Sequence, residues 1–142
     1  TQLLALNRRA LHNLPFEAAK IHLPPEADET FWHAVRGNVD LSAEIPHWWD
    51  VVHGTIIPPS QAEDRAFLQQ ALDTLPVEPW GEETWKDWTN ALKEQSGRNG
   101  RSLFMPLRLA LTGEDAGPEL HVLLGLMGRE RTVDSLRDAI QA

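Results

Sequence analysis

One glycine-punctuated stretch decides the fold that we expect. Residues 96–113 read SGRNGRSLFMPLRLALTG. A glycine readily ends a helix in the left-handed conformation, and a proline fits the first turn of a helix. Gly97 is therefore expected to end one helix, and Pro106 to start a short helix that ends at Gly113. Short helices separated by glycines favour a compact helical cage over a long bundle.

The same punctuation continues toward the end of the chain. Pro118 is expected to start a helix that ends at Gly128. A terminal helix then carries an apolar stripe formed by Val133, Leu136 and Ile140. The last third of the chain is thus predicted to be a run of short helices.

Helical spacing of apolar residues also recurs upstream. No segment shows the sustained apolar and polar alternation of a strand, so the predicted fold class is all-α. The expected helices span residues 3–14, 16–23, 27–36, 41–52 and 82–97, and another runs from a capping box at Ser60–Glu63 to about Leu75. Pro46 is expected to kink or interrupt its helix.

A proline-rich break divides the chain into two predicted subdomains. Residues 54–59 read GTIIPP, and a glycine followed shortly by two prolines cannot continue a helix. The junction is expected here or at the next proline-rich break, residues 76–80. We adopt a proximal helical subdomain at residues 1–57 and a distal one at residues 58–142, which carries the quoted stretch.

The charge distribution leaves room for a local basic face on an acidic chain. The formal net charge is −8, which argues at first against a nucleic-acid partner. Residues 1–85 carry five basic and thirteen acidic side chains, whereas residues 86–142 carry eight of each. The acidic excess therefore lies in the first part. A protein that binds one short unpaired loop needs only a small basic patch.

Several kinds of chemistry are not predicted. The chain has no cysteine, its six histidines lack the spacing of a helical zinc site, and it has no phosphate-binding glycine loop or nucleophile elbow. We therefore predict no catalytic residue, no metal site and no cofactor in this chain. No apolar run approaches the roughly 20 residues that span a bilayer, and residues 1–4 lack the layout of a signal peptide. We expect a cytoplasmic protein with no membrane partner.

Six tryptophans permit two interpretations. Unpaired bases stack well on aromatic rings, so the tryptophans could bind RNA. Five of them lie at helical spacing among other apolar residues, which favours a place in the core; these are Trp32, Trp48, Trp49, Trp85 and Trp88. Trp80, which follows a proline, stays undecided. Aromatic content alone does not establish a nucleic-acid partner.

The quoted stretch also carries a resemblance to a known family. Together with the later Gly117-Pro118-Glu119-Leu120, it resembles the C-terminal signature of bacterial-type glutamyl-tRNA synthetases, which are class I aminoacyl-tRNA synthetases. In that signature, a Gly-basic-x-Gly-basic turn precedes Leu-Phe-x-Pro-Leu-Arg-x-Ala-Leu-Thr-Gly and then Gly-Pro-Glu-Leu. Weaker similarity at residues 6–15, 35–38 and 128–131 extends it over nearly the whole chain. The sequence departs from the pattern at Asn99, where a second basic residue is common.

The resemblance implies an all-α region of two subdomains that grips the anticodon loop of glutamate tRNA. In that family, ATP and glutamate bind a Rossmann-type catalytic domain of the same polypeptide, N-terminal to this region. Neither the His-x-Gly-His nor the Lys-x-Ser-Lys type of motif occurs in this chain. We therefore expect a monomeric tRNA-binding module that catalyses nothing alone.

The resemblance also assigns candidate binding residues. Arg108 is expected to read base edges in the anticodon, because a guanidinium can both hydrogen-bond and stack. Gly117, Pro118 and Leu120 belong to a turn that is expected to present backbone groups to splayed bases and, with Arg108, to meet the first two anticodon bases. Arg36 matches a position that can contact the third base.

Two further arginines are expected to contact backbone phosphates. Arg98 and Arg101 flank Gly100 in the predicted turn. Each base-reading role has a purely structural alternative. Arg108 could form an internal salt bridge, the Gly117 turn could only redirect the chain, and Arg36 could interact with a helix dipole. A rival function is a helical protein-interaction module without RNA function, which the acidic balance and the tryptophans favour.

Overall fold

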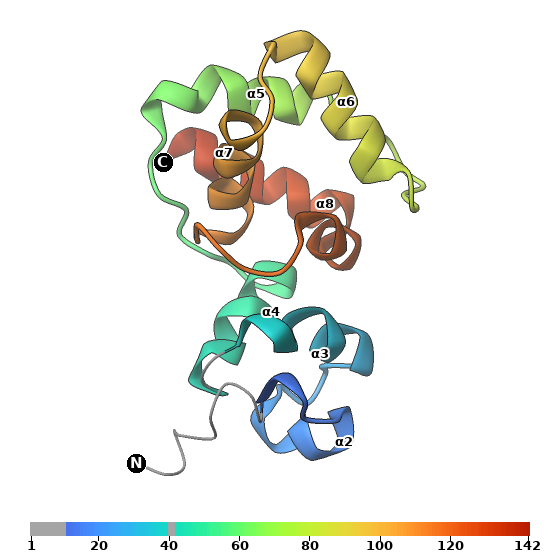
Figure 1. Cartoon of the computed structure of the whole chain (residues 1–142). Coiled ribbons are helices and arrows are strands. Elements are labelled where there is room, and N and C mark those ends of the chain that lie inside the picture. The colour runs from blue at the N-terminus through green and yellow to red at the C-terminus, as the bar shows by residue number, and fades with distance from the viewer. Residues whose placement is uncertain (1–10, 40–41) are drawn as a thin grey trace.

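The computed structural model describes residues 11–39 and 42–142, and every regular element in these two ranges is helical (Figure 1). The α-helices are α2 (Phe16–Ala19), α3 (Glu29–Val35), α4 (Ile45–His53), α5 (Arg65–Asp73), α6 (Thr84–Ser96), α7 (Arg101–Thr112) and α8 (Leu120–Gln141). Single 3₁₀ turns lie at Lys20–His22, Arg36–Asn38, Ser42–Glu44 and Ala62–Asp64. The all-α prediction is confirmed for this part of the chain. Most of the helix expected at residues 3–14 lies outside it.

The helices form two groups that meet at α4 and α8. Figure 1 shows α2, α3 and α4 together at one end, and α5, α6 and α7 around α8 at the other. Helix α8 contacts α5, α7 and α4, so it joins both groups. The extended segment after α4 crosses from one group to the other. The subdomain boundary at residue 57 remains a prediction.

The expected apolar face of residues 27–36 is present in α3. Phe31, Trp32 and Val35 are buried. The carboxylate of Asp28 accepts a 2.8 Å hydrogen bond from the backbone N–H of Phe31, which satisfies a free amide at the helix start. The indole N–H of Trp32 donates to the carbonyl of Leu14 at 2.7 Å, so this fully buried ring leaves no unpaired donor.

Two local predictions, a kink at Pro46 and a capping box at Ser60–Glu63, are wrong. Pro46 does not interrupt a helix, because α4 begins at Ile45 and the proline occupies its first turn, where no backbone donor is needed. The Ser60–Glu63 capping box does not form: a 3₁₀ turn precedes α5, and the Ser60 hydroxyl donates to the carbonyl of Ala142 at 3.2 Å. A contact with a distant segment has replaced the local one.

The quoted stretch also begins its helix earlier than predicted. Gly97 and Gly113 end α6 and α7 with φ of 70° and 75°, as expected. Helix α7 starts at Arg101, however, so Pro106 lies inside the helix instead of starting it. The carbonyl of Ser102 thereby loses the N–H donor that a regular helix would supply from residue 106.

Helix α8 also differs from the prediction at its start. It starts at Leu120, two residues after the predicted Pro118. Gly128 interrupts it with a non-helical φ of 77° and ψ of 170°, which confirms the predicted break. In the second half of α8, Val133 and Leu136 are buried, and Ile140 packs against the core while partly exposed.

Half of the six tryptophans are buried in the core. Trp32, Trp48 and Trp88 are buried, and the other three are half-buried and pack against the core. The indole N–H of Trp88 donates to the carbonyl of Ala71 at 2.8 Å, which links α6 to α5. The predicted core role is therefore confirmed for Trp32, Trp48 and Trp88.

Candidate nucleic-acid interface

Arg108 is fixed against the predicted binding turn. It lies on α7, and its Nη1 donates a 3.0 Å hydrogen bond to the carbonyl oxygen of Pro118. Partial burial lowers the pKa of Arg108 below its ordinary value, because desolvation disfavours the charged form. Among the described residues Arg108 pairs with no carboxylate, so the salt-bridge alternative is not what holds it. A guanidinium has five donors, and this bond uses one of them.

The same arginine anchors the other end of the loop that joins α7 to α8. The Thr112 hydroxyl donates to the backbone carbonyl of Arg108 at 2.8 Å and accepts from the backbone N–H of Glu114 at 3.0 Å. Thr112 is fully buried. Residues 113–119, called here the α7–α8 loop, are therefore held to α7 at both ends. Sequence reasoning missed Thr112, whose only signal is its place beside a helix-ending glycine.

Gly117 is required by a close approach from the other group of helices. A Cβ atom added there would lie 2.4 Å from Cη2 of Trp48, whose indole comes from α4. Non-bonded carbon atoms do not approach so closely, so any larger residue would force the Trp48 ring or the turn to shift. The Gly117 turn is thus pressed against α4, which goes beyond the chain-turning role considered as its alternative.

The other two members of the predicted turn differ in what they can offer a ligand. Pro118 is buried and its carbonyl is taken by Arg108. Leu120 begins α8 and its side chain is 5% exposed, so it belongs to the core. A direct role for Leu120 in binding would have to use its backbone.

Arg36 lies in the 3₁₀ turn that follows α3 and is half-buried. Its neighbour Asn38 lines two surface hollows, one shared with Trp48 and Gly117 and the other with Glu119. The structure therefore brings the Arg36 turn and the α7–α8 loop to one junction, with Asn38 at the contact. Arg36 is also the C-terminal flanking residue of α3, which suits the helix-dipole alternative.

The hollow between α4 and the α7–α8 loop is acidic. Glu44, Glu114 and Asp115 line it. The Nε2 atom of His47 lies 3.7 Å from Oε1 of Glu114, an ion-pair distance if the histidine is protonated. Carboxylates repel phosphates and accept hydrogen bonds from amino groups, so this hollow suits base edges better than an RNA backbone.

Arg98 is engaged within the protein. Its Nη1 donates to Oδ1 of Asp64 at 2.7 Å and to the carbonyl of Ser102 at 3.2 Å. Its guanidinium also lies over the ring of Phe67, 4.3 Å from the centroid. Its predicted phosphate contact remains a prediction, and these contacts give it a structural role as well.

Arg101 has no such engagement. It is the first residue of α7 and is exposed, and its side chain forms no hydrogen bond or ion pair with any residue in the described ranges. It lines an open hollow together with Gln61 and Met105. Its guanidinium is therefore available to a ligand in solution.

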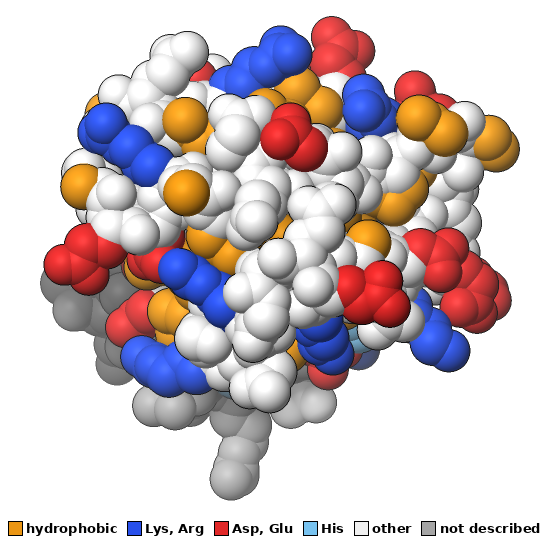
Figure 2. All heavy atoms as spheres, turned by 90° about the horizontal axis from the view of Figure 1, so that it is seen from above, with side chains coloured by type: hydrophobic (Ala, Val, Ile, Leu, Met, Phe, Trp, Pro, Cys, Tyr) orange, Lys and Arg blue, Asp and Glu red, His pale blue; other side chains and the backbone are white. Residues whose placement is uncertain are grey.

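Basic side chains do not gather into one broad patch on the face that carries α5 and α6. Figure 2 shows Lys and Arg side chains scattered there among acidic and apolar ones. Electrostatic attraction on this face is therefore local. The small basic turn before α7 agrees with such a pattern better than a wide phosphate-binding surface does.

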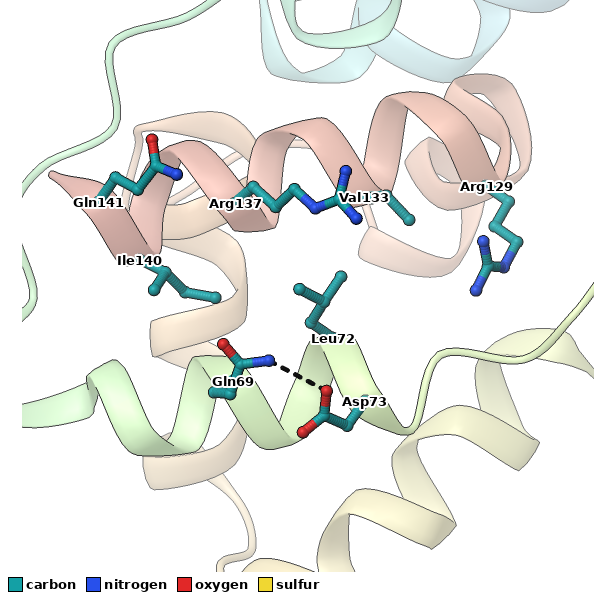
Figure 3. Close-up of a pocket in the computed structure, with 8 residues that line it drawn as sticks. All are labelled: Gln69, Leu72, Asp73, Arg129, Val133, Arg137, Ile140 and Gln141. Atoms are coloured by element: carbon teal, nitrogen blue, oxygen red, sulfur yellow. Dashed lines mark hydrogen bonds between the residues drawn. The ribbon is translucent and has the colours of Figure 1, made fainter.

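A separate cleft lies between α5 and α8 (Figure 3). Arg129 and Arg137 line it from α8, and Asp73 lines it from α5. Nε of Arg129 donates to the carbonyl of Pro76 at 3.0 Å. Val133 also lines this cleft, whereas Ser135, about 200° away around the helix, donates to Ala110 of α7 at 2.8 Å. Helix α8 therefore separates the cleft from Arg108.

Comparison with known families identifies the chain. Residues 58–140 match the model of the anticodon binding domain. The chain belongs to this family. The match covers every residue proposed for the interface except Arg36, including the α7–α8 loop and the basic turn before α7.

Relatives of this anticodon-binding chain are glutamate–tRNA ligases. It is 95% identical over 142 residues to glutamate–tRNA ligase 2 of Gluconobacter oxydans (strain 621H), covering 100% of this chain and 32% of that protein. It is 57% identical over 138 residues to glutamate–tRNA ligase 2 of Gluconacetobacter diazotrophicus, covering 97% and 31% respectively. The chain thus spans about a third of the length of the curated relatives it matches.

The fold of this anticodon-binding chain also matches a solved structure. A glutamate tRNA ligase from Elizabethkingia meningosepticum, crystallised with its amino acid, superposes with a TM-score of 0.67 at 19% identity. The alignment covers 99% of this chain and 30% of that one. Among the described residues, no three His, Asp or Glu side chains are grouped to hold a metal ion, and no helix is long and apolar enough to cross a bilayer.

Proposed function

We propose that this domain binds the anticodon loop of glutamate tRNA on behalf of a glutamate–tRNA ligase. The family and the names of the relatives support the class of ligand. The observation that carries the proposal is the guanidinium of Arg108, which one hydrogen bond fixes on the α7–α8 loop while its other donors have no partner among the described residues. A preorganised guanidinium with free donors can recognise a base edge without first losing conformational entropy.

The parts of the interface have different roles in this proposal. Arg108 and the Gly117–Leu120 turn meet the first two anticodon bases, and Arg36 contacts the third. Arg101 and Arg98 contact backbone phosphates, with Arg101 the better placed of the two because it is exposed and unpaired. The acidic hollow beside the loop keeps phosphates away and favours the amino groups of bases.

The chemistry of aminoacylation belongs elsewhere in this proposal. ATP and glutamate bind a catalytic domain of the same polypeptide, and this domain supplies only tRNA selection. A monomeric state and a cytoplasmic location are further parts of the proposal, consistent with the relatives being tRNA ligases.

A salt-dependent binding titration tests the proposal. The 142-residue chain is titrated against glutamate tRNA and an unrelated tRNA at several salt concentrations, by filter binding or gel shift. We expect tighter binding to glutamate tRNA at every salt concentration, with affinity that falls as salt rises. Equal or absent binding of the two tRNAs would contradict the proposal and favour the rival protein-interaction module.

A further inference from the structure

The indole of Trp48 is the point at which α4 meets the α7–α8 loop. Trp48 is 5% exposed, and the outer carbons of its six-membered ring are the atoms nearest to Gly117. A looser contact lies at the start of the loop, where a Cβ on Gly113 would be 3.7 Å from Cδ1 of Ile56, an ordinary van der Waals distance. In both contacts the partner of the loop, Trp48 or Ile56, lies outside helices α5 to α8.

The residue beside Trp48 reinforces this contact. The imidazole of His47 packs edge-on against the Trp48 indole, with 4.9 Å between ring centroids and 71° between planes. The same imidazole approaches Glu114 of the loop. Both side chains come from the first turns of α4, where Pro46 stiffens the backbone. The loop is thus held by α4 at Gly117 and by α7 at Pro118.

Trp48 also lines the same hollow as part of the other proposed reading element. The hollow that it lines with Gly117 includes Asn38, which ends the 3₁₀ turn begun by Arg36. The Trp48 ring, packed on Gly117, therefore lies in the same hollow as the end of the Arg36 turn. Dense packing makes such a contact resist compression and sliding.

We propose that Trp48 is a positioning residue for anticodon reading, whose ring fixes the Gly117–Leu120 turn relative to Arg36 so that both elements engage one loop together. The inference rests on the proposed function and adds a residue that touches no base. Its physical basis is effective concentration: two reading elements held at the right spacing bind together far more tightly than either alone. A loose junction would leave each element intact but uncoupled.

The decisive comparison is Trp48→Phe against Trp49→Phe. Phenylalanine at position 48 keeps an aromatic core side chain but removes the outer carbons that meet Gly117. Trp49 is the matched control, because its ring packs on Phe31 and His53, with centroids 5.1 Å and 4.3 Å away, and not on the loop. Each variant is titrated with glutamate tRNA and with the same tRNA changed only at the third anticodon base.

We expect Trp48→Phe to bind glutamate tRNA about tenfold more weakly and to lose most of the penalty for the third-base change, because the two elements no longer act together. Trp49→Phe should keep that penalty. Gly117→Ala gives an independent measurement, since its methyl would push the turn from the Trp48 side. It should reduce the penalty too, and Trp48→Phe in the same chain should restore part of the affinity by making room.

Circular dichroism and a melting curve accompany each titration, because a merely structural role would change stability without changing the affinity ratio. An unchanged ratio in folded Trp48→Phe, or equal changes in both tryptophan variants, would overturn the positioning role. If Trp48→Phe does not fold, an unchanged ratio in Gly117→Ala decides against it in the same way. Failure of the wild-type chain to distinguish glutamate tRNA from an unrelated tRNA would instead contradict the proposed function itself.

Discussion

Arg98 donates a hydrogen bond from Nη1 to the carbonyl oxygen of Ser102, across 3.2 Å. In an uninterrupted helix, that oxygen would accept the N–H of residue 106, which here is proline. The arginine therefore supplies the donor that the proline cannot. The basic turn before α7 and the proline inside α7 act as one structural unit.

Replacing Arg98 should destabilise the fold. Arg98→Ala removes the bond to Ser102, the contact with Asp64 and the stacking on Phe67. We expect a loss of about 2 kcal/mol in the free energy of unfolding, mainly from the Ser102 hydrogen bond and the stacking on Phe67. The ion pair with Asp64 is partly exposed and contributes little. Urea unfolding measures it. Arg98→Lys should lose nearly as much, since lysine lacks the planar fork; full stability of the lysine variant would show that only the charge matters.

Arg101 provides the contrasting case. Arg101→Ala should leave the free energy of unfolding within about 0.5 kcal/mol of wild type, because the side chain is exposed and unpaired. The proposed phosphate contact should instead be seen in tRNA binding, where the slope of log affinity against log salt should fall by about one unit. A normal slope combined with normal stability would leave Arg101 without either role.

The two arginines that we propose to read bases should differ in which tRNAs they affect. Glutamate and glutamine anticodons differ only at the third base, so Arg108→Ala should weaken binding of both tRNAs alike, by about 1 to 3 kcal/mol. Arg36→Gln, measured in the full-length ligase, should mainly relax the preference between them. A lower melting temperature with an unchanged preference would assign Arg36 to the end of α3.

The isolated chain should show no ATP-dependent glutamate activation. The motifs through which class I synthetases bind ATP do not occur in its 142 residues. Pyrophosphate exchange with glutamate and ATP is the measurement, and the full-length ligase is the positive control. Turnover above background in a pure preparation would mean that the chain carries an active site that its sequence does not reveal.

Features that depend on a few neighbouring residues were predictable. The ends of α6 and α7 and the break in α8 follow from Gly97, Gly113 and Gly128, because a positive φ is readily adopted only by glycine. The apolar face of α3 followed from its spacing in the same way. Predictions from short local signals failed where a distant partner competed, as when the Ser60 hydroxyl bonded Ala142 instead of capping α5.

By itself, the sequence determined the helical class, the punctuation between helices and the family to which the quoted stretch belongs, since these rest on residues close together in the chain. Only the tertiary structure decided that Pro106 lies inside α7, that Arg98 donates a hydrogen bond to Ser102, and that Trp48 packs against Gly117. The last contact joins α4 to the loop after α7, and packing between segments so far apart follows from how all the helices share one core. Local propensity does not contain that information.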